Sequence, residues 1–210
     1  MSTDTHPVDA PRQPPVGRLS YEEFLDWCDE DTLAEWVEGE VFVASPASLP
    51  HQTLVRFLTA LLSTVAEQDD LGLVIPAPFQ MRLHDPPRGR EPDVFFVARA
   101  HLDRLRHTYL DGPADLVVEI TSPESFARDR GAKFVEYERA GIPEYWLLDP
   151  DRRQAEFYQL DDAGRYRLVP ADARGVYQSR VLPRLRLPVA WLWQEPLPPL
   201  LDALHALELL

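Results

Sequence analysis

Two carboxylates stand in or beside apolar runs that are typical of buried strands. Glu119 follows Val117 and Val118 in the run ADLVVEI, and Asp93 begins the run DVFFVA directly after Pro92. An ionised carboxylate is rarely buried unless it is paired or bound to a metal ion. On adjacent strands of a central sheet, the two side chains would form an oxygen-rich site suited to Mg²⁺ or Mn²⁺. The alternative is that each pairs with an arginine or caps a nearby loop.

A single lysine is the next feature of interest. Of the 21 Lys and Arg residues, only Lys133 is a lysine. Lysine is a compact point charge on a flexible stem, whereas arginine is a planar fork. One lysine among twenty arginines therefore either marks a position that requires the point charge or reflects codon bias.

The predicted helix around Lys133 gives this side chain two alternative roles. We expect a helix from about Ser125 to Ala140. At about 100° per residue, Lys133 lies on the side of Phe126 and Tyr137, which faces the sheet. The positions away from that side are Arg128, Val135, Glu136, Glu138 and Arg139. Lys133 can then pair with Asp129, one helical turn earlier, or point its ammonium group at Glu119.

His51 lies in the first turn of another predicted helix, on the face of Leu54, Leu58 and Leu62. A histidine in such a place is more often a hydrogen-bonded core residue than a metal ligand. The sequence shows no second histidine at metal-binding spacing, no glycine-rich phosphate loop and no serine nucleophile elbow. Any chemistry is therefore expected to involve the carboxylates and Lys133.

The N-terminal half is predicted to form a short helix, a hairpin, a long helix and several strands. Ser20 and Glu23 form a capping box before YEEFLDW, and WVEGEVFVAS alternates around Glu38-Gly39 as hairpin strands do. Ser48 is the expected N-cap of the helix LPHQTLVRFLTALLSTVAEQ. Two short strands are expected in LGLVIPAPFQMRL, two buried strands in EPDVFFVA and ADLVVEI, and a short helix or loop in HLDRLRHTYLDG.

The C-terminal half predicts a strand–helix–strand unit, a hairpin and a last helix. ADLVVEI, the Lys133 helix and EYWLLD should pair their strands in parallel through a right-handed crossover. We expect a mixed α/β (α+β) fold with a central mixed sheet flanked by helices and with N-terminal and C-terminal hairpin extensions. The expected organisation is a disordered tail over residues 1–19, one domain over 20–195 and a C-terminal helix over 196–210.

Composition limits the classes of partner and compartment. The net charge is −14, and residues 1–40 contribute −9 of it, which argues against tight non-specific DNA binding without excluding it. Cys28 is the only cysteine, which fits a reducing compartment. Because the sequence has neither a signal-peptide pattern nor an apolar run of about 18 residues, we expect a soluble cytoplasmic protein that does not enter a membrane.

Taken together, these residues resemble the PD-(D/E)xK nuclease superfamily with its restriction-endonuclease-like fold, and more specifically the Uma-two family of restriction endonucleases. The resemblance covers about residues 20–195 and rests on EWVEGE, Ser45-Pro46, His51-Gln52, EPDVFFV, PADLVVEITSPES, Asp129, Lys133 and GIPEYWLLDP. The chain departs from the superfamily pattern at Thr121, where a lysine is usual. Lys133, twelve positions later, would supply that lysine from the following helix.

The resemblance implies a divalent-metal-dependent endonuclease that hydrolyses DNA phosphodiester bonds. Asp93, Glu119 and the Ile120 carbonyl would hold Mg²⁺ (or Mn²⁺). Lys133 would orient the attacking water and share charge in the transition state. His51 would replace the helix carboxylate that is usual in the superfamily.

The resemblance also implies a further acidic residue in the cleft, a DNA substrate and a second copy of the chain. One of Glu35, Glu38 and Glu40 is expected to reach the cleft, but the sequence does not show which. DNA is the expected substrate, and a homodimer is expected because two symmetry-related sites can cut both strands of a duplex.

Two other interpretations are open from the sequence. One is a catalytically inactive module on the same fold that binds nucleic acid or protein, and the other is an enzyme that hydrolyses a different phosphate ester. Salt-dependent DNA affinity would separate DNA-directed proteins from the last class. Metal-dependent turnover would separate the enzyme from the inactive module.

Overall fold

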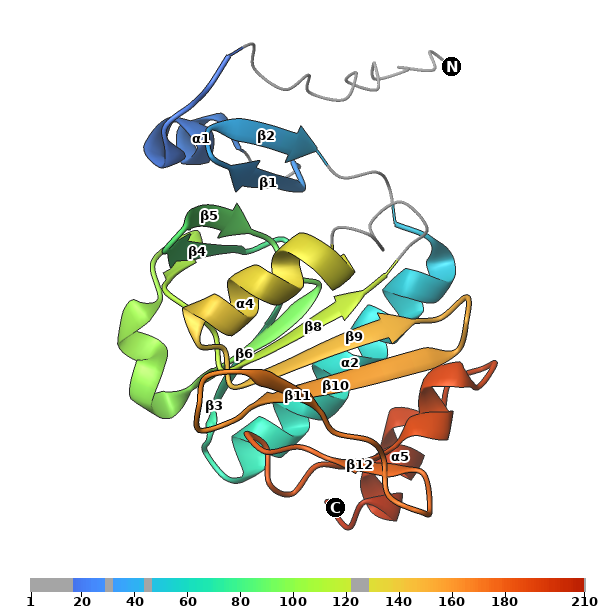
Figure 1. Cartoon of the computed structure of the whole chain (residues 1–210). Coiled ribbons are helices and arrows are strands. Elements are labelled where there is room, and N and C mark those ends of the chain that lie inside the picture. The colour runs from blue at the N-terminus through green and yellow to red at the C-terminus, as the bar shows by residue number, and fades with distance from the viewer. Residues whose placement is uncertain (1–16, 29–31, 44–46, 122–128, 210) are drawn as a thin grey trace, which may run out of the picture.

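The computed structural model describes residues 17–28, 32–43, 47–121 and 129–209 (Figure 1). Most of the predicted disordered tail, residues 1–16, lies outside the described part. Within the described ranges, no helix combines the length and apolarity needed to cross a membrane.

The centre of the fold is a six-stranded mixed sheet with the strand order β11-β10-β9-β8-β6-β3. Its strands are β3 (Gly72–Pro76), β6 (Val94–Ala98), β8 (Leu116–Ile120), β9 (Glu144–Asp149), β10 (Gln154–Leu160) and β11 (Tyr166–Leu168). β8 and β9 pair in parallel, as predicted, and the other neighbours pair antiparallel. Every residue of β8 and β9 is buried, which is typical of strands covered on both faces.

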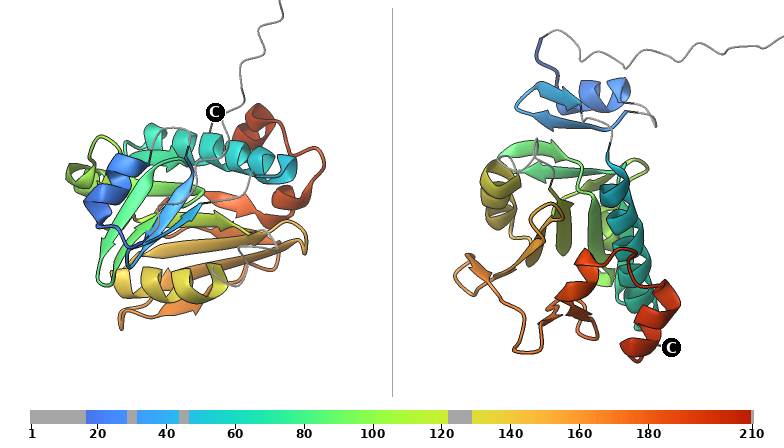
Figure 2. Two further views of the ribbon diagram at one scale, coloured as in Figure 1. Left: turned by 90° about the horizontal axis from the view of Figure 1, so that it is seen from above. Right: turned by 90° about the vertical axis from the view of Figure 1, so that its right-hand side faces the viewer.

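Helices lie on both faces of this sheet, which confirms the predicted fold class (Figures 1 and 2). α2 (Leu49–Gln68) begins at the N-cap Ser48 and buries Leu54, Leu58 and Leu62 against one face. α4 (Phe134–Ala140) lies on the other face, where Tyr137 packs with Val117 and Tyr145. The two helices therefore reach the strand ends from opposite sides.

A second sheet of five strands, in the order β2-β1-β5-β4-β7, packs on the α4 side. It consists of β1 (Ala34–Val37), β2 (Glu40–Val43), β4 (Gln80–His84), β5 (Pro87–Arg90) and β7 (Tyr109–Asp111), with α1 (Tyr21–Trp27) beside it. Met81, Leu83 and Leu110 of this sheet share one apolar cluster with Phe95 and Val97 of the central sheet. Through this packing the N-terminal hairpin is held close to the helix that carries Lys133.

The sequence did not predict the second sheet as a unit. The hairpin β1–β2 and the strands β3 and β4 were expected, but β5 and β7 were not. β5 has the sequence PRGR and β7 the sequence YLD, and neither shows an apolar alternation. Hydrogen bonds to neighbouring strands, rather than local propensity, make these segments extended.

The segment that leads into α4 also differs from the prediction. Residues 122–128 lie outside the described part, and Asp129–Lys133 form a turn of π-helix before α4 begins at Phe134. Short π-helical turns inside helices are frequent at functional sites. Gly141, with φ of 77°, ends α4 in the left-handed conformation that glycine tolerates.

The remaining elements lie toward the C-terminus or connect strands. They are the 3₁₀ helices η1 (Arg99–Arg104) and η3 (Val189–Trp193), the strands β12 (Val176–Gln178) and β13 (Arg186–Pro188), and α5 (Leu200–Ala206). α5 packs against α2 and is shorter than the predicted helix over 196–210. Pro196, Pro198 and Pro199 precede it, and because a proline disfavours the helical conformation of the residue before it, the helix starts only after them.

Candidate active site

Asp93 lies where β6 begins and β8 ends, below the first turn of α2. Its Oδ2 accepts a hydrogen bond of 2.7 Å from the backbone N–H of Ile120, and its Oδ1 lies 3.1 Å from His51 Nε2. Both side chains keep some exposure, 20% for Asp93 and 16% for His51. The structure therefore brings together three of the residues singled out in the sequence, Asp93, Ile120 and His51, at one end of the central sheet.

The environment of His51 favours its protonated form. Burial lowers the pKa of His51, but the hydrogen bond to Asp93, the charge of Asp93 and the backbone of Ile120 raise it, and the net pKa lies above the ordinary value. His51 is thus a partner of the Asp93 carboxylate rather than a core residue bonded only to the backbone.

Lys133 lies at the centre of a buried group of three carboxylates. Its Nζ is 2.8 Å from Glu35 Oε1, 2.9 Å from Glu119 Oε1 and 3.2 Å from Asp129 Oδ1. These four residues are here named the Lys133 cluster, and each is 8% exposed or less. The two roles considered for Lys133 are therefore not exclusive, because the ammonium group contacts Asp129 and Glu119 together.

The charge of Lys133 is held in place by its neighbours. Burial by itself lowers the pKa of Lys133, but Glu119, Glu35 and Asp129 raise it well above the ordinary value. A lysine with such a pKa stays protonated at neutral pH. It can therefore stabilise negative charge, but it is not suited to accept a proton.

Burial changes the pKa of Glu119 in the Lys133 cluster. Burial raises its pKa to about 8; Lys133 opposes this shift, and Asp129, Asp93 and Glu35 add to it. Tyr137, one turn after Lys133, donates a hydrogen bond of 2.7 Å to Glu119 Oε1. A divalent cation next to Glu119 is the kind of partner that would favour its ionised form.

Glu35 is the N-terminal glutamate that reaches the site. Its Oε1 contacts Lys133, and its Oε2 accepts a hydrogen bond of 2.9 Å from Arg90 Nη1. Glu38 instead pairs with Arg88 and is 62% exposed, and Glu40 is exposed. Of the three glutamates only Glu35 lies within β1; Glu38 is in the turn that follows it, and Glu40 begins β2.

The structure adds polar residues that the sequence reasoning did not select. Arg90 is 2% exposed and contacts both Glu35 and Glu136. The sequence correctly placed Glu136 on the side of its helix that faces away from the central sheet. Because the second sheet covers that side, Glu136 is buried. Glu91 is also buried and bonds the backbone N–H of Ala34 at 2.9 Å, and burial raises its pKa to about 8. For Arg90 and Glu91, the only feature of the sequence that could have indicated a role is the charged run RGREPD just before β6.

A divalent cation fits the donor groups at the end of β8. In the described ranges, no three His, Cys, Asp or Glu side chains converge as metal ligands, so an ion would rest on two carboxylates and a backbone oxygen. Mg²⁺ typically uses one or two carboxylates and keeps several waters. Among the described residues, the hydrogen bond from Tyr137 and the ion pair with Lys133 both fall on Oε1 of Glu119, so Oε2 is the atom of Glu119 that is available to an ion.

Comparison with known proteins finds a sequence relative and a solved structure with a similar fold. The chain is 25% identical over 152 residues to the uncharacterised protein slr1290 of Synechocystis sp., a match that covers 71% of this chain and 78% of the relative. A crystal structure described as "a putative nuclease belonging to DUF820" from Anabaena variabilis superposes with a TM-score of 0.69. That match has 15% sequence identity and covers 82% of this chain and 96% of the other, so it shows a shared fold.

A protein-family model assigns this chain to a family. The model named Uma2, with the description "putative restriction endonuclease", matches residues 21–190. This range contains Asp93, Glu119, Lys133 and His51, together with both sheets and both helices that position them. The chain belongs to the Uma2 family.

Proposed function

We propose that the protein is a divalent-metal-dependent endonuclease that hydrolyses DNA phosphodiester bonds. The observation that carries this proposal is the convergence of Asp93, Glu119 and Lys133 at one end of the central sheet. Membership of the Uma2 family and the fold shared with a nuclease structure support a nuclease-like function.

Asp93, Glu119 and the Ile120 carbonyl are the groups that would hold Mg²⁺ or Mn²⁺. When bound, such a cation would stabilise charge on the phosphate oxygens and lower the pKa of water. His51 would fix the orientation of Asp93 through the contact between Nε2 and Oδ1, which measures 3.1 Å. This support matters because metal affinity depends on the groups that hold each ligand in position.

Lys133 would act on the phosphate as a fixed positive charge. Its pKa, raised by Glu119, Glu35 and Asp129, keeps it protonated while water attacks phosphorus and one P–O ester bond breaks. A preorganised cation costs no reorganisation during the reaction and is worth about 10²–10³ in rate when a single such donor is removed. Tyr137 would hold the Glu119 carboxylate in position, and Glu35 would hold the Lys133 ammonium group in position.

Nicking of supercoiled plasmid and of single-stranded DNA, with Mg²⁺ or Mn²⁺, tests the proposal. We expect metal-dependent cleavage by the wild type and a loss of about 10²-fold or more in Lys133→Arg, because a planar fork cannot meet three carboxylates as an ammonium group does. Asp93→Asn should also lose activity. Glu38→Gln is the matched control, since Glu38 is exposed and contacts Arg88 rather than Lys133.

The outcomes separate the alternative functions. Equal cleavage by wild type and Lys133→Arg would refute the role of Lys133. Absence of cleavage with every metal and substrate, combined with salt-dependent DNA binding, would favour an inactive binding module on this fold. We also propose a homodimer for cutting duplex DNA, and a monomeric mass by light scattering in the presence of DNA would refute it.

A further inference from the structure

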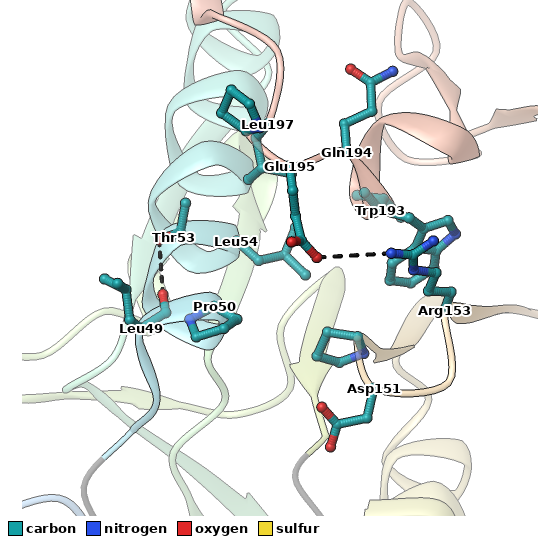
Figure 3. Close-up of a pocket in the computed structure, with 13 residues that line it drawn as sticks. Leu49, Pro50, Thr53, Leu54, Asp151, Arg153, Trp193, Gln194, Glu195 and Leu197 are labelled. Atoms are coloured by element: carbon teal, nitrogen blue, oxygen red, sulfur yellow. Dashed lines mark hydrogen bonds and ion pairs between the residues drawn. The ribbon is translucent and has the colours of Figure 1, made fainter.

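A cavity lies beside the candidate active site and outside the groups assigned to it. Its volume is about 340 Å³, at the lower end of the range of small-molecule pockets. It is open to solvent and bordered by the start of α2, by the turn between β9 and β10, and by the end of η3 with the segment after it (Figure 3). Its lining includes Thr53, Trp193 and the pair formed by Arg153 and Glu195.

The connectivity places this cavity at the same edge of the sheet as Asp93. Leu49 and Pro50 immediately precede His51 in the first turn of α2. On the opposite side, the backbone N–H of Thr121 donates to Leu148 O at 2.7 Å, which ties the end of β8 to the end of β9. The turn that follows β9 carries Asp151 and Arg153. A chain bound at Asp93 and Ile120 would therefore pass close to the cavity.

The charges of the lining favour a neutral ligand. Asp151 and Glu195 are acidic and Arg153 is basic, so the charged lining residues contribute a net negative charge. A phosphate group would be repelled there, whereas a nucleobase carries no charge. An arginine guanidinium group can also stack on an aromatic or base face.

The shape and the walls of the cavity also suit a base. Trp193 lines it and is half-buried, which leaves part of an indole surface for stacking, and bases of every type stack on aromatic side chains. Leu54 and Leu192 supply buried apolar surface. The ion pair between Arg153 and Glu195 crosses the cavity at 3.9 Å (Figure 3), and its side chains are 66% and 89% exposed. A pair so exposed is weak and can open at little cost.

We propose that this cavity binds one nucleobase of the DNA strand next to the bond that is cut. The proposal rests on the proposed nuclease function for its substrate class, and it assigns Trp193 as the stacking residue. Because stacking tolerates every base, the cavity would hold the strand without selecting its sequence. It would also compensate for the acidic charge of the protein, which weakens contacts to phosphates.

Fluorescence anisotropy with two matched probes tests the proposal. One probe is a labelled oligothymidylate of about ten nucleotides, a typical single-strand site size, and the other is the same sugar–phosphate chain without bases. Both are titrated at low salt in Ca²⁺, which carboxylate oxygens also bind. We expect the wild type to bind the base-containing probe about tenfold more tightly, as expected for one stacked base, and Trp193→Ala to abolish the difference.

Two further variants address folding and specificity. Thr53→Phe fills the cavity from the exposed start of α2 and should also abolish the difference, without removing a side chain that packs on the core. Trp191→Ala removes a neighbouring indole that does not line the cavity and should preserve the difference. Thermal melts confirm that each variant is folded.

Parallel samples with Mg²⁺ or Mn²⁺ in place of Ca²⁺, examined on a denaturing gel, measure cleavage separately. Equal binding of both probes by the wild type, or a difference that survives in Trp193→Ala and Thr53→Phe, would overturn the proposal even if cleavage occurs. A difference abolished by both variants would support the base cavity even if no cleavage were seen, in which case only the nuclease function would fail.

Discussion

Replacing Arg90 by methionine should destabilise the protein more than replacing any exposed arginine. Arg90 Nε and Nη2 contact Glu136 at 2.8 and 2.9 Å, and Nη1 contacts Glu35 at 2.9 Å. Only 2% of the residue is exposed. Methionine fills a similar volume but leaves two buried carboxylates without this partner, and removal of one member of a buried ion pair costs about 3–5 kcal/mol.

The magnitude can be checked against an internal control. For a protein of this size, a loss of about 3–5 kcal/mol lowers the melting temperature by roughly 6–20 °C. Arg139 pairs with Asp85 at 2.7 Å, but their side chains are 57% and 78% exposed. Arg139→Met should therefore cost no more than about 1 kcal/mol.

Urea unfolding followed by tryptophan fluorescence measures both effects as free energies of unfolding. The double variant Arg90→Met with Glu136→Met should be more stable than Arg90→Met alone, because it removes a carboxylate that would otherwise be buried with fewer partners. A cost below about 1 kcal/mol for Arg90→Met, equal to that of an exposed pair, would refute the reasoning. So would a double variant that is less stable than the single one.

Three further predictions concern the core, pH and the metal. Glu144 is fully buried and accepts hydrogen bonds from Trp146, Tyr177, Ser179 and the backbone of residues 180 and 181. Since each unsatisfied donor costs about 1–3 kcal/mol, Glu144→Leu should lower the free energy of unfolding in urea by at least about 3 kcal/mol. Glu144→Gln should lower it less. The backbone N–H of Tyr166 and the Arg165 guanidinium hold the pKa of Glu138 below its usual range. The contribution of Glu138 to the stability of the fold is therefore present above the unfolded pKa of about 4.3 and is lost as pH falls through the folded pKa. Melting temperatures over the acid range should depend less on pH in Glu138→Gln than in the wild type. Because Lys133 is the only lysine, isotope-labelled lysine gives one side-chain NMR signal. Mg²⁺ should shift this signal in the wild type and in Glu38→Gln but not in Asp93→Asn. An equal shift in Asp93→Asn would contradict the proposed metal site.

The main residues of the candidate site could be selected from the sequence because they depart from the local pattern of the elements around them. A carboxylate in the apolar run of β8, an aspartate at the start of β6 and a lone lysine in a chain rich in arginine are visible without a structure. Helical spacing also predicted that Lys133 and Tyr137 share a side, and both contact Glu119.

The missed residues belong to segments with no regular pattern. Arg90 lies in the segment PRGR, which has no apolar alternation, and this segment forms a strand only through its pairing with β1 and β4. Glu136 was correctly placed away from the central sheet, but its burial was not predicted, because a helical projection shows the direction of a side chain and not which element covers it. The second sheet covers that side and supplies Arg88 and Arg90 as partners.

The sequence by itself determined the fold class and the parallel unit of β8 and β9, and it indicated the carboxylates and the lysine that form the candidate site. Periodicity and capping act over a few residues, so a linear chain displays them directly. Only the tertiary structure decided that Glu35, rather than Glu38 or Glu40, meets Lys133, and that Arg90 and Glu136 support this contact. These contacts join residues far apart in sequence, and the packing of one sheet on another determines which of them meet.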